Sequence, residues 1–348
     1  TKFMKYTTLP GTDIEVSKIC LGTMTFGNQN SEAEGFEQMD LALDKGVNFF
    51  DTAELYPVPA NAKTQGETER IMGNWFKKTG NRSKIVLASK AAGPGSYTAH
   101  IRENLCFNKA NIIEALDNSL KRLQTDYLDL YQLHWPERMT NFFGQRGYFH
   151  NPKDPWEENF EEVLETLDEL VKAGKIRQVG LSNETPWGMM RYLEASKKGL
   201  PKMITIQNPY SLLTRVFEVG NSEICMRENV GLLAYSPLGF GRLTGKYRGG
   251  HNLDKARLTL FPNMARYNSD QSIEATEQYY QIAQNHDISL TQMALAFVNS
   301  QPFLTSNIVG ATSVEQLQEN IDSIDLTLSK ELLKEIEAVH NQIPNPAP

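Results

Sequence analysis

Short apolar runs rich in β-branched residues alternate with longer stretches of helical periodicity along almost the whole chain. Each run is continuously apolar, which is typical of a parallel strand covered on both faces. Strands that alternate with helices in this way predict a (β/α)8 TIM barrel, and a doubly wound open sheet is the alternative that the pattern leaves open. The predicted strands are residues 17–21, 47–51, 85–89, 127–133, 178–181, 204–207, 232–235 and 306–309.

Residues at the expected helix ends support this pattern. Ser31 and Glu34 have the spacing of a capping box, and Ser313 and Gln316 repeat that spacing after the last strand. Thr185 precedes a proline, as an N-cap residue precedes a proline in the first helical turn. These signals predict helices that begin directly after residues 31, 185 and 313.

Additional segments are expected at both ends of the predicted barrel. Residues 5–8 and 14–16 predict a short hairpin ahead of the first barrel strand. Long insertions at residues 91–107, 137–155 and 239–270 all follow the carboxyl ends of strands, where barrel active sites are built. The sequence contains no internal repeat and no low-complexity linker, so we expect a single domain over residues 1–348.

Composition and charge exclude several classes of protein. The chain has 348 residues, 40% of them hydrophobic, and its 42 acidic against 35 basic side chains give little electrostatic support for nucleic-acid binding. Its three cysteines have no metal-like spacing and favour a reducing compartment, so the cytoplasm is the expected location. No apolar run approaches the ~20 residues of a membrane span, and we therefore expect no membrane contact.

Four polar residues lie at or just after the ends of three consecutive predicted strands: Asp51, Tyr56, Lys90 and His134. Each has an ordinary explanation when taken singly, such as a helix cap, a loop residue or a surface charge. In a barrel, however, the carboxyl ends of neighbouring strands converge. We therefore expect these four side chains to form one cluster.

Such a cluster can deliver a proton to an oxygen that develops negative charge. A tyrosine hydroxyl has a reference pKa of ~10, and we expect the Lys90 ammonium to lower the pKa of Tyr56. Asp51 would keep Lys90 charged, and His134 could donate to a carbonyl oxygen. The carbon of that carbonyl then needs a hydride donor. The histidine spacing predicts no metal site.

No Rossmann fingerprint accompanies this cluster. The glycine-rich run 239–246 follows the seventh strand but misses both the G-x-G-x-x-G and the P-loop patterns. Barrels often bind phosphate in the loops after strands seven and eight, and the eighth strand ends at Gly310 before a capped helix. Lys246 and Arg257 could hold an additional phosphate there, although, taken alone, residues of these types are more often solvated surface charges.

Ordered motifs along nearly the whole chain resemble the aldo-keto reductase superfamily. Within it the chain is most similar to the bacterial Tas-type reductases, near the branch that includes the potassium-channel β subunits. The motifs are LGTMTFG (21–27), NFFDTAELY (48–56), ASK (88–90), LKRL (120–123), DYLDL (126–130), HWP (134–136), GLSN (180–183), QNPY (207–210), YSPL (235–238) and IVGAT (308–312).

The resemblance implies a barrel that binds NADPH in an extended pose and reduces an aldehyde or ketone. Asp51, Tyr56, Lys90 and His134 would be the catalytic tetrad, with Tyr56 as general acid. The cofactor contacts that it implies are Thr23, Met24 and Asp51; Ser182, Asn183 and Gln207 at the carboxamide; Tyr235 on the nicotinamide ring; Ser236, Leu238, Gly239 and Lys246 at the pyrophosphate; and Gly310, Arg257, Thr312, Gln316, Glu319 and Asn320 toward the adenosine end.

Two segments depart from the family pattern. Residues 57–62 intervene where a short glycine-containing turn is usual, which predicts an unusual pocket rim. The insertion after His134 carries Phe142, Phe143, Tyr148 and Phe149, which could line a substrate pocket or, as we slightly favour, pack the loop onto the barrel.

Two functions other than carbonyl reduction also fit these residues. The same tetrad fits an NADPH-binding, redox-sensing regulatory subunit with slow turnover, as the channel resemblance permits. A barrel aldolase with Lys90 as a Schiff-base nucleophile is a third interpretation, but that role needs a neutral amine, and a paired Asp51 opposes it. The sequence predicts a small-molecule carbonyl substrate without identifying it, and it leaves the oligomeric state open.

Overall fold

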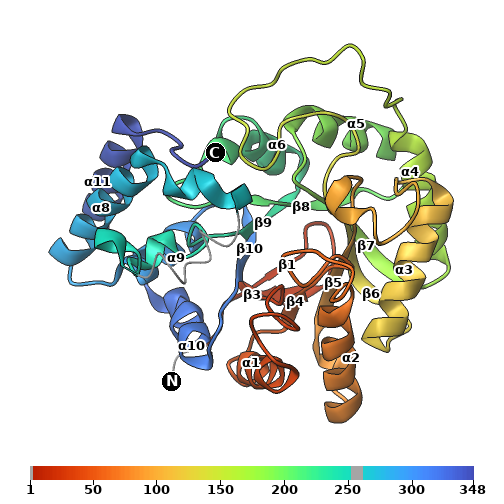
Figure 1. Cartoon of the computed structure of the whole chain (residues 1–348), viewed down its shortest axis with the longest axis horizontal. Coiled ribbons are helices and arrows are strands. Elements are labelled where there is room, and N and C mark those ends of the chain that lie inside the picture. Colours follow the sequence, from red (N-terminus) through yellow and green to blue (C-terminus); the bar gives the residue numbers. More distant parts are fainter. Residues whose placement is uncertain (1–2, 252–261) are drawn as a thin grey trace.

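The computed structural model describes residues 3–251 and 262–348 of the chain. Its parallel strands close into a barrel in which neighbours follow the chain order and the last strand pairs with the first (Figure 1). The predicted TIM barrel is confirmed, and the open-sheet alternative is wrong. The barrel strands are β3 (Ile19–Gly22), β4 (Phe49–Asp51), β5 (Val86–Ala91), β6 (Leu128–Leu133), β7 (Ile176–Ser182), β8 (Met203–Pro209), β9 (Gly231–Tyr235) and β10 (Leu304–Val309).

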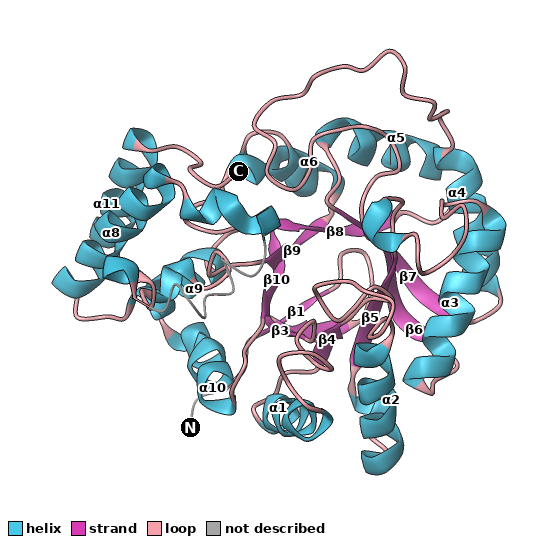
Figure 2. Ribbon diagram, in the orientation of Figure 1, coloured by secondary structure: helices cyan, strands magenta, loops and turns pink. Residues whose placement is uncertain are grey.

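Helices form an outer layer around these strands (Figure 2). Their apolar faces pack on the outer side of the barrel in one continuous core. None of the described helices is long and apolar enough to cross a membrane. The helices are α1 (Glu32–Asp44), α2 (Glu67–Thr79), α3 (Lys109–Leu123), α4 (Phe160–Lys172), α5 (Pro186–Ser196), α6 (Asn221–Glu228), α8 (Asp270–Asn285), α9 (Leu290–Asn299), α10 (Val314–Asp322) and α11 (Lys330–Gln342).

The expected hairpin precedes the barrel and consists of β1 (Tyr6–Thr8) and β2 (Glu15–Ser17). Apolar residues of this hairpin segment, among them Leu9 and Val16, pack with Phe49 and other residues inside the barrel. Ser17 was expected in the first barrel strand, but it pairs with Tyr6 and so belongs to the hairpin. The hairpin therefore covers one end of the barrel interior, and the opposite end is left for the site.

The helix caps follow the predicted chemistry with one difference. Ser31 and Glu34 form a complete capping box, and the Thr185 hydroxyl accepts from the Gly188 amide. Ser313 caps α10, but the Gln316 side chain reaches one residue further than a capping box requires. Its Oε1 accepts from the Thr312 amide at 3.0 Å.

Helices α2 and α3 approach each other closely at Gly73. A Cβ on this glycine would lie 2.1 Å from the carbonyl oxygen of Arg122 and 3.0 Å from the Cα of Leu123. Since these are backbone atoms, the helices would have to move apart. We expect Gly73→Ala to destabilise the protein by about 1–3 kcal/mol in urea unfolding.

Lys78→Ala, at an exposed position of the same helix, is the control and should change the free energy of unfolding by less than about 0.5 kcal/mol. A Gly73→Ala protein that unfolds at the wild-type urea concentration would contradict the close approach of the two helices.

Candidate active site

The four predicted catalytic residues meet at the carboxyl ends of β4, β5 and β6. The Lys90 ammonium donates to Asp51 Oδ2 at 2.7 Å, to the Tyr56 hydroxyl at 3.1 Å and to the Thr52 carbonyl at 2.9 Å. The rings of Tyr56 and His134 meet edge to face with their centroids 5.8 Å apart. Residues separated by more than eighty positions in the chain thus form one polar cluster.

Two glutamine amides hold the second oxygen of the Asp51 carboxylate. Gln132 and Gln207 each donate from Nε2 to Asp51 Oδ1 at 3.0 Å, and Gln207 also donates to Gln132 Oε1 at 2.8 Å. With Lys90 on the other oxygen, the buried carboxylate has a complete set of donors and a fixed orientation. Gln132 was not among the expected site residues, although its place two residues before His134 on β6 could have indicated it.

Burial raises the pKa of Tyr56 above its ordinary value. The Lys90 ammonium acts in the opposite direction but does not offset the loss of water around the phenol. Lys90 thus acts on the pKa of Tyr56 in the expected direction, but the net shift is upward, which the sequence could not indicate because it does not show how deeply the phenol is buried. At neutral pH the hydroxyl carries its proton and can donate it.

Lys90 and His134 keep the protonation states that the chemistry needs. Burial alone would lower the pKa of Lys90, but Asp51 and Tyr56 outweigh it and raise the pKa above its ordinary value. A permanently charged ammonium cannot act as a Schiff-base nucleophile, which disfavours the aldolase interpretation. Burial, together with the Lys90 charge, holds the pKa of His134 well below its ordinary value, so the imidazole is neutral.

A cavity of about 1130 Å³ opens beside this cluster. Its size exceeds the ~300–1,000 Å³ of ordinary small-molecule pockets, so it has room for a long ligand and a second small molecule. Tyr56, Asp51 and His134 line it, whereas Lys90 is fully buried behind them. The expected cofactor residues that line it are Thr23, Met24, Asp51, Ser182, Asn183, Gln207, Tyr235, Ser236, Leu238, Lys246, Gly310, Thr312, Gln316, Glu319 and Asn320.

Two expected cofactor residues are not in this set. Gly239 does not line the cavity; a Cβ on it would face Leu213 and Tyr267 at 3.4 Å. Arg257 lies outside the described residues. Tyr247 and Arg266 line the cavity without having been expected to, since nothing in their local sequence distinguishes them from surface residues.

The family-model comparison agrees with this geometry. The model described as the aldo/keto reductase family matches residues 18–341 of the chain. The chain belongs to the aldo/keto reductase family. Membership of this family makes the protein an oxidoreductase with carbonyl reduction as its general chemistry. Among the described residues, no group of His, Cys, Asp and Glu side chains could hold a metal ion.

Relatives in several organisms resemble this aldo/keto reductase over most of their length. It is 51% identical over 347 residues to the Escherichia coli K12 protein tas, covering 99% of this chain and 100% of that protein. It is 34% identical to the uncharacterized oxidoreductase YrpG of Bacillus subtilis, over 95% and 94% of the two chains. Norsolorinic acid reductase A of Aspergillus parasiticus is 29% identical, over 94% and 79%.

Where Ser182, Asn183 and Tyr235 line the cavity, side chains of this reductase hold one another in place. The Ser182 hydroxyl donates to the Gln207 carbonyl at 2.9 Å, and the Asn183 amide donates to the His134 carbonyl at 2.9 Å. The Tyr235 hydroxyl donates to Asn183 Oδ1. The hydrogen bond of its hydroxyl fixes the half-buried ring of Tyr235 in the cavity wall.

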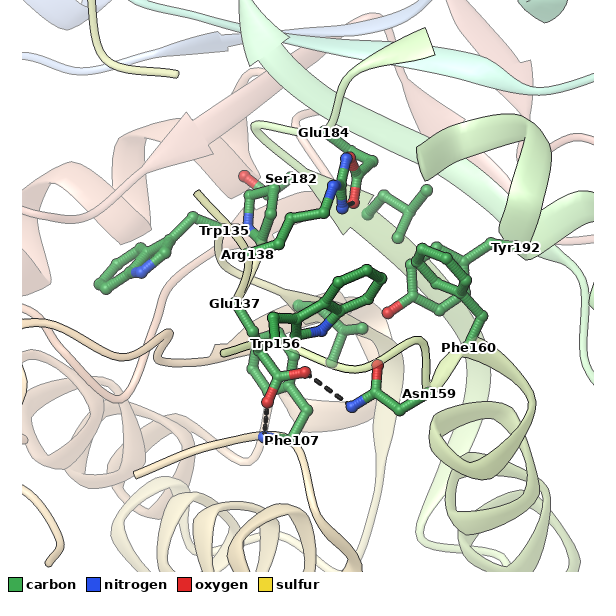
Figure 3. Close-up of a pocket in the computed structure, with 13 residues that line it drawn as sticks. Phe107, Trp135, Glu137, Arg138, Trp156, Asn159, Phe160, Ser182, Glu184 and Tyr192 are labelled. Carbon is green, nitrogen blue, oxygen red and sulfur yellow. Dashed lines mark hydrogen bonds and ion pairs between the residues drawn. The ribbon is translucent and has the colours of Figure 1, made fainter. Parts of the chain in front are cut away.

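Two buried ion pairs stiffen the loops that carry these residues. Arg138, after β6, donates to Glu184 at 3.1 Å through Nη1, with the Trp187 ring 5.0 Å from its guanidinium carbon. Figure 3 shows Arg138 directed at Glu184, one residue beyond Asn183. On the other side Arg102 makes two bonds, of 2.7 and 2.9 Å, to Glu54 in the loop before Tyr56. No local motif in the sequence indicated either pair.

Of the aromatic residues in the β6–α4 loop, one lines the cavity and another packs the loop onto the barrel. Phe143 lines the cavity, with its ring 5.9 Å from that of Trp135, whereas Phe142 packs against the neighbouring apolar cluster. Tyr148 and Phe149 are exposed and line no part of the cavity. Tyr97 completes an aromatic wall next to Trp135.

Proposed function

We propose that this protein is an NADPH-dependent reductase that converts an aldehyde or ketone to the corresponding alcohol, with Tyr56 as general acid. The observation that carries the proposal is the 3.1 Å bond between the Lys90 ammonium and the Tyr56 hydroxyl at the wall of a cavity large enough for cofactor and substrate. Membership of the aldo/keto reductase family supports the general reaction.

The cavity fits an extended dinucleotide. Gly310 lines it, and a Cβ on that glycine would meet no atom within 4 Å, so the backbone there is open to a ligand. The amino end of α10 lies next to Gly310 and favours an anion. Lys246 and Gln316 also line the cavity: Lys246 is suited to the pyrophosphate, and Gln316 would face the 2′-phosphate that distinguishes NADPH from NADH. Ser182, Asn183 and Tyr235 would hold the nicotinamide end.

In this reaction bound NADPH supplies a hydride to the carbonyl carbon. The neutral His134 imidazole and the Tyr56 hydroxyl would orient the carbonyl oxygen, and the Tyr56 proton would pass to that oxygen as the C=O double bond becomes a C–O single bond. Lys90 would stabilise the resulting tyrosinate, and Asp51 would hold the ammonium in place. Water then returns a proton to Tyr56.

Steady-state oxidation of NADPH with a panel of aldehydes and ketones tests the proposal. We expect turnover with at least one class of carbonyl and micromolar binding of NADPH in a fluorescence titration, a range typical of enzyme cofactors and substrates. Tight NADPH binding with negligible turnover on every carbonyl would instead favour the regulatory subunit, and no binding would exclude both.

The pH dependence of reduction follows from the shifted pKa values. Reduction needs protonated Tyr56, so the raised pKa of Tyr56 moves the loss of activity at alkaline pH to higher pH. Reduction also needs neutral His134, so the lowered pKa of His134 moves any loss of activity at acidic pH to lower pH. We expect kcat/KM for an uncharged aldehyde to stay flat from about pH 6 to pH 9 and to fall only above about pH 10. A decline centred near pH 7 would contradict these assignments.

A further inference from the structure

Within residues 3–251 and 262–348, Arg266 of the 3-10 helix η7 (Pro262–Asn268) has the Tyr267 ring 5.1 Å from its guanidinium carbon but no carboxylate partner. Its Nε and Nη1 are buried, and neither has a hydrogen-bond partner within residues 3–251 and 262–348. Every other arginine in those ranges pairs with a carboxylate or donates to a backbone carbonyl. A guanidinium stays charged at physiological pH, so its burial without a carboxylate partner among the described residues is costly.

The side chain of Arg266 borders the part of the cavity that the β6–α4 loop forms. It lines the cavity together with Asp51, Tyr56 and His134, and a Cβ on Gly144 would lie only 2.9 Å from its Nη1. Gly144 follows Phe143, whose ring packs on Trp135, and Trp135 lies beside His134 with ring centroids 5.0 Å apart. Arg266 thus lies against the β6–α4 loop, which carries Trp135 and Phe143.

The acidic side chains that line the cavity do not neutralise Arg266. Among the described lining residues these are Asp51, which is bonded to Lys90, and Glu319 on α10, which lies within reach of Ser289 Oγ. The phosphate contacts proposed above come from other elements, Lys246 after η4 (Arg242–Thr244) and Gln316 on α10. Arg266 is therefore a cation in the cavity to which the proposed cofactor pose assigns no role.

We propose that Arg266 binds the carboxylate of the substrate. The proposal rests on the reductase function and names its substrate class: a carbonyl compound with a planar apolar body and a carboxylate distant from the carbonyl. The body would lie along Tyr97, Trp135 and Phe143, whose rings border the cavity. A guanidinium forms short, charge-assisted bonds to a carboxylate, roughly twice as strong as bonds between neutral groups.

The test compares 4-formylbenzoate with its neutral methyl ester in the full-length protein at saturating NADPH. We expect Arg266→Gln to lower kcat/KM for 4-formylbenzoate roughly 10- to 100-fold, the usual worth of a hydrogen bond to a charged group. The ester should change less than about threefold, and Arg266→Lys should recover part of the loss because it keeps the charge.

Arg191→Gln is the matched control, because it removes the same charge from an exposed pair with Glu158. It should leave the ratio between acid and ester unchanged. Equal losses of kcat/KM on both substrates in Arg266→Gln would overturn the proposal. An unchanged ratio of kcat/KM between acid and ester together with weaker NADPH binding would also overturn it, because Arg266 would then be a cofactor contact.

Calorimetry with terephthalate, which carries no reducible carbonyl, separates this proposal from the reductase function. The protein loaded with NADP⁺ should bind terephthalate at least 10-fold more tightly than Arg266→Gln does, by the same energetic argument. This difference without turnover of either aldehyde would keep the anion site and reject the reductase. Turnover of both aldehydes with equal terephthalate binding by wild type and variant would keep the reductase and reject the anion site.

Discussion

Replacing Tyr56 with phenylalanine is expected to lower the rate of carbonyl reduction roughly 100- to 10,000-fold, the usual contribution of general acid catalysis. The ring keeps its edge-to-face contact with His134, but the hydroxyl that accepts from Lys90 is gone, and with it the proton for the carbonyl oxygen. The measurement is single-turnover oxidation of bound NADPH by an excess of aldehyde. Binding of NADPH should change little, because the proposed cofactor contacts lie on other residues.

Tyr148→Phe provides the comparison, since it removes a phenol from an exposed tyrosine that does not line the cavity. Its rate should stay within about threefold of the wild type, as for a residue without a part in proton transfer. If Tyr56→Phe reduces aldehydes as fast as the wild type, Tyr56 is not the proton donor, and the chemical assignment of the whole cluster is wrong.

Replacing Lys90 with methionine is expected to cost both activity and stability. Methionine fills much of the same space but leaves the Asp51 carboxylate, 2% exposed, without its cation. Breaking a buried ion pair from one side typically destabilises a protein by about 3–5 kcal/mol, because an uncompensated charge remains. We expect a loss of this size in chemical denaturation, together with loss of reduction.

The double variant Lys90→Met, Asp51→Asn tests the cause of that loss. It removes the stranded charge and retains side-chain volume, so it should recover much of the stability and none of the reduction. The Gln132 and Gln207 amides each still need an acceptor, so we expect recovery to be incomplete. A Lys90→Met protein as stable as the wild type would mean that the pair contributes nothing to the fold.

The barrel could be predicted because its strands are short, continuously apolar and separated by helices with recognisable caps. Ser17 was misassigned because the chain passes from hairpin to barrel strand within two residues, and an apolar run does not show where the pairing partner changes. The four catalytic candidates could be brought together from sequence since each ends or follows a strand, and the strand ends of a closed barrel converge.

Other parts of the site depend on burial and on contacts between distant residues, which local patterns do not carry. The net pKa shift of Tyr56 could not be predicted because the depth of the cavity wall decides it. The pairs of Arg138 with Glu184 and of Arg102 with Glu54 join loops about fifty residues apart. Arg266 is noticeable only once its surroundings show that no carboxylate of the described residues pairs with it.

Transfer of deuterium from NADPH labelled at both C4 positions of the nicotinamide to an aldehyde tests the central claim most directly. The account predicts that the product alcohol carries one deuterium on its carbinol carbon by mass spectrometry, and that Tyr56→Phe slows its appearance without lowering the fraction labelled. An alcohol formed without deuterium, or no consumption of the labelled cofactor with any carbonyl, would contradict hydride transfer at this site.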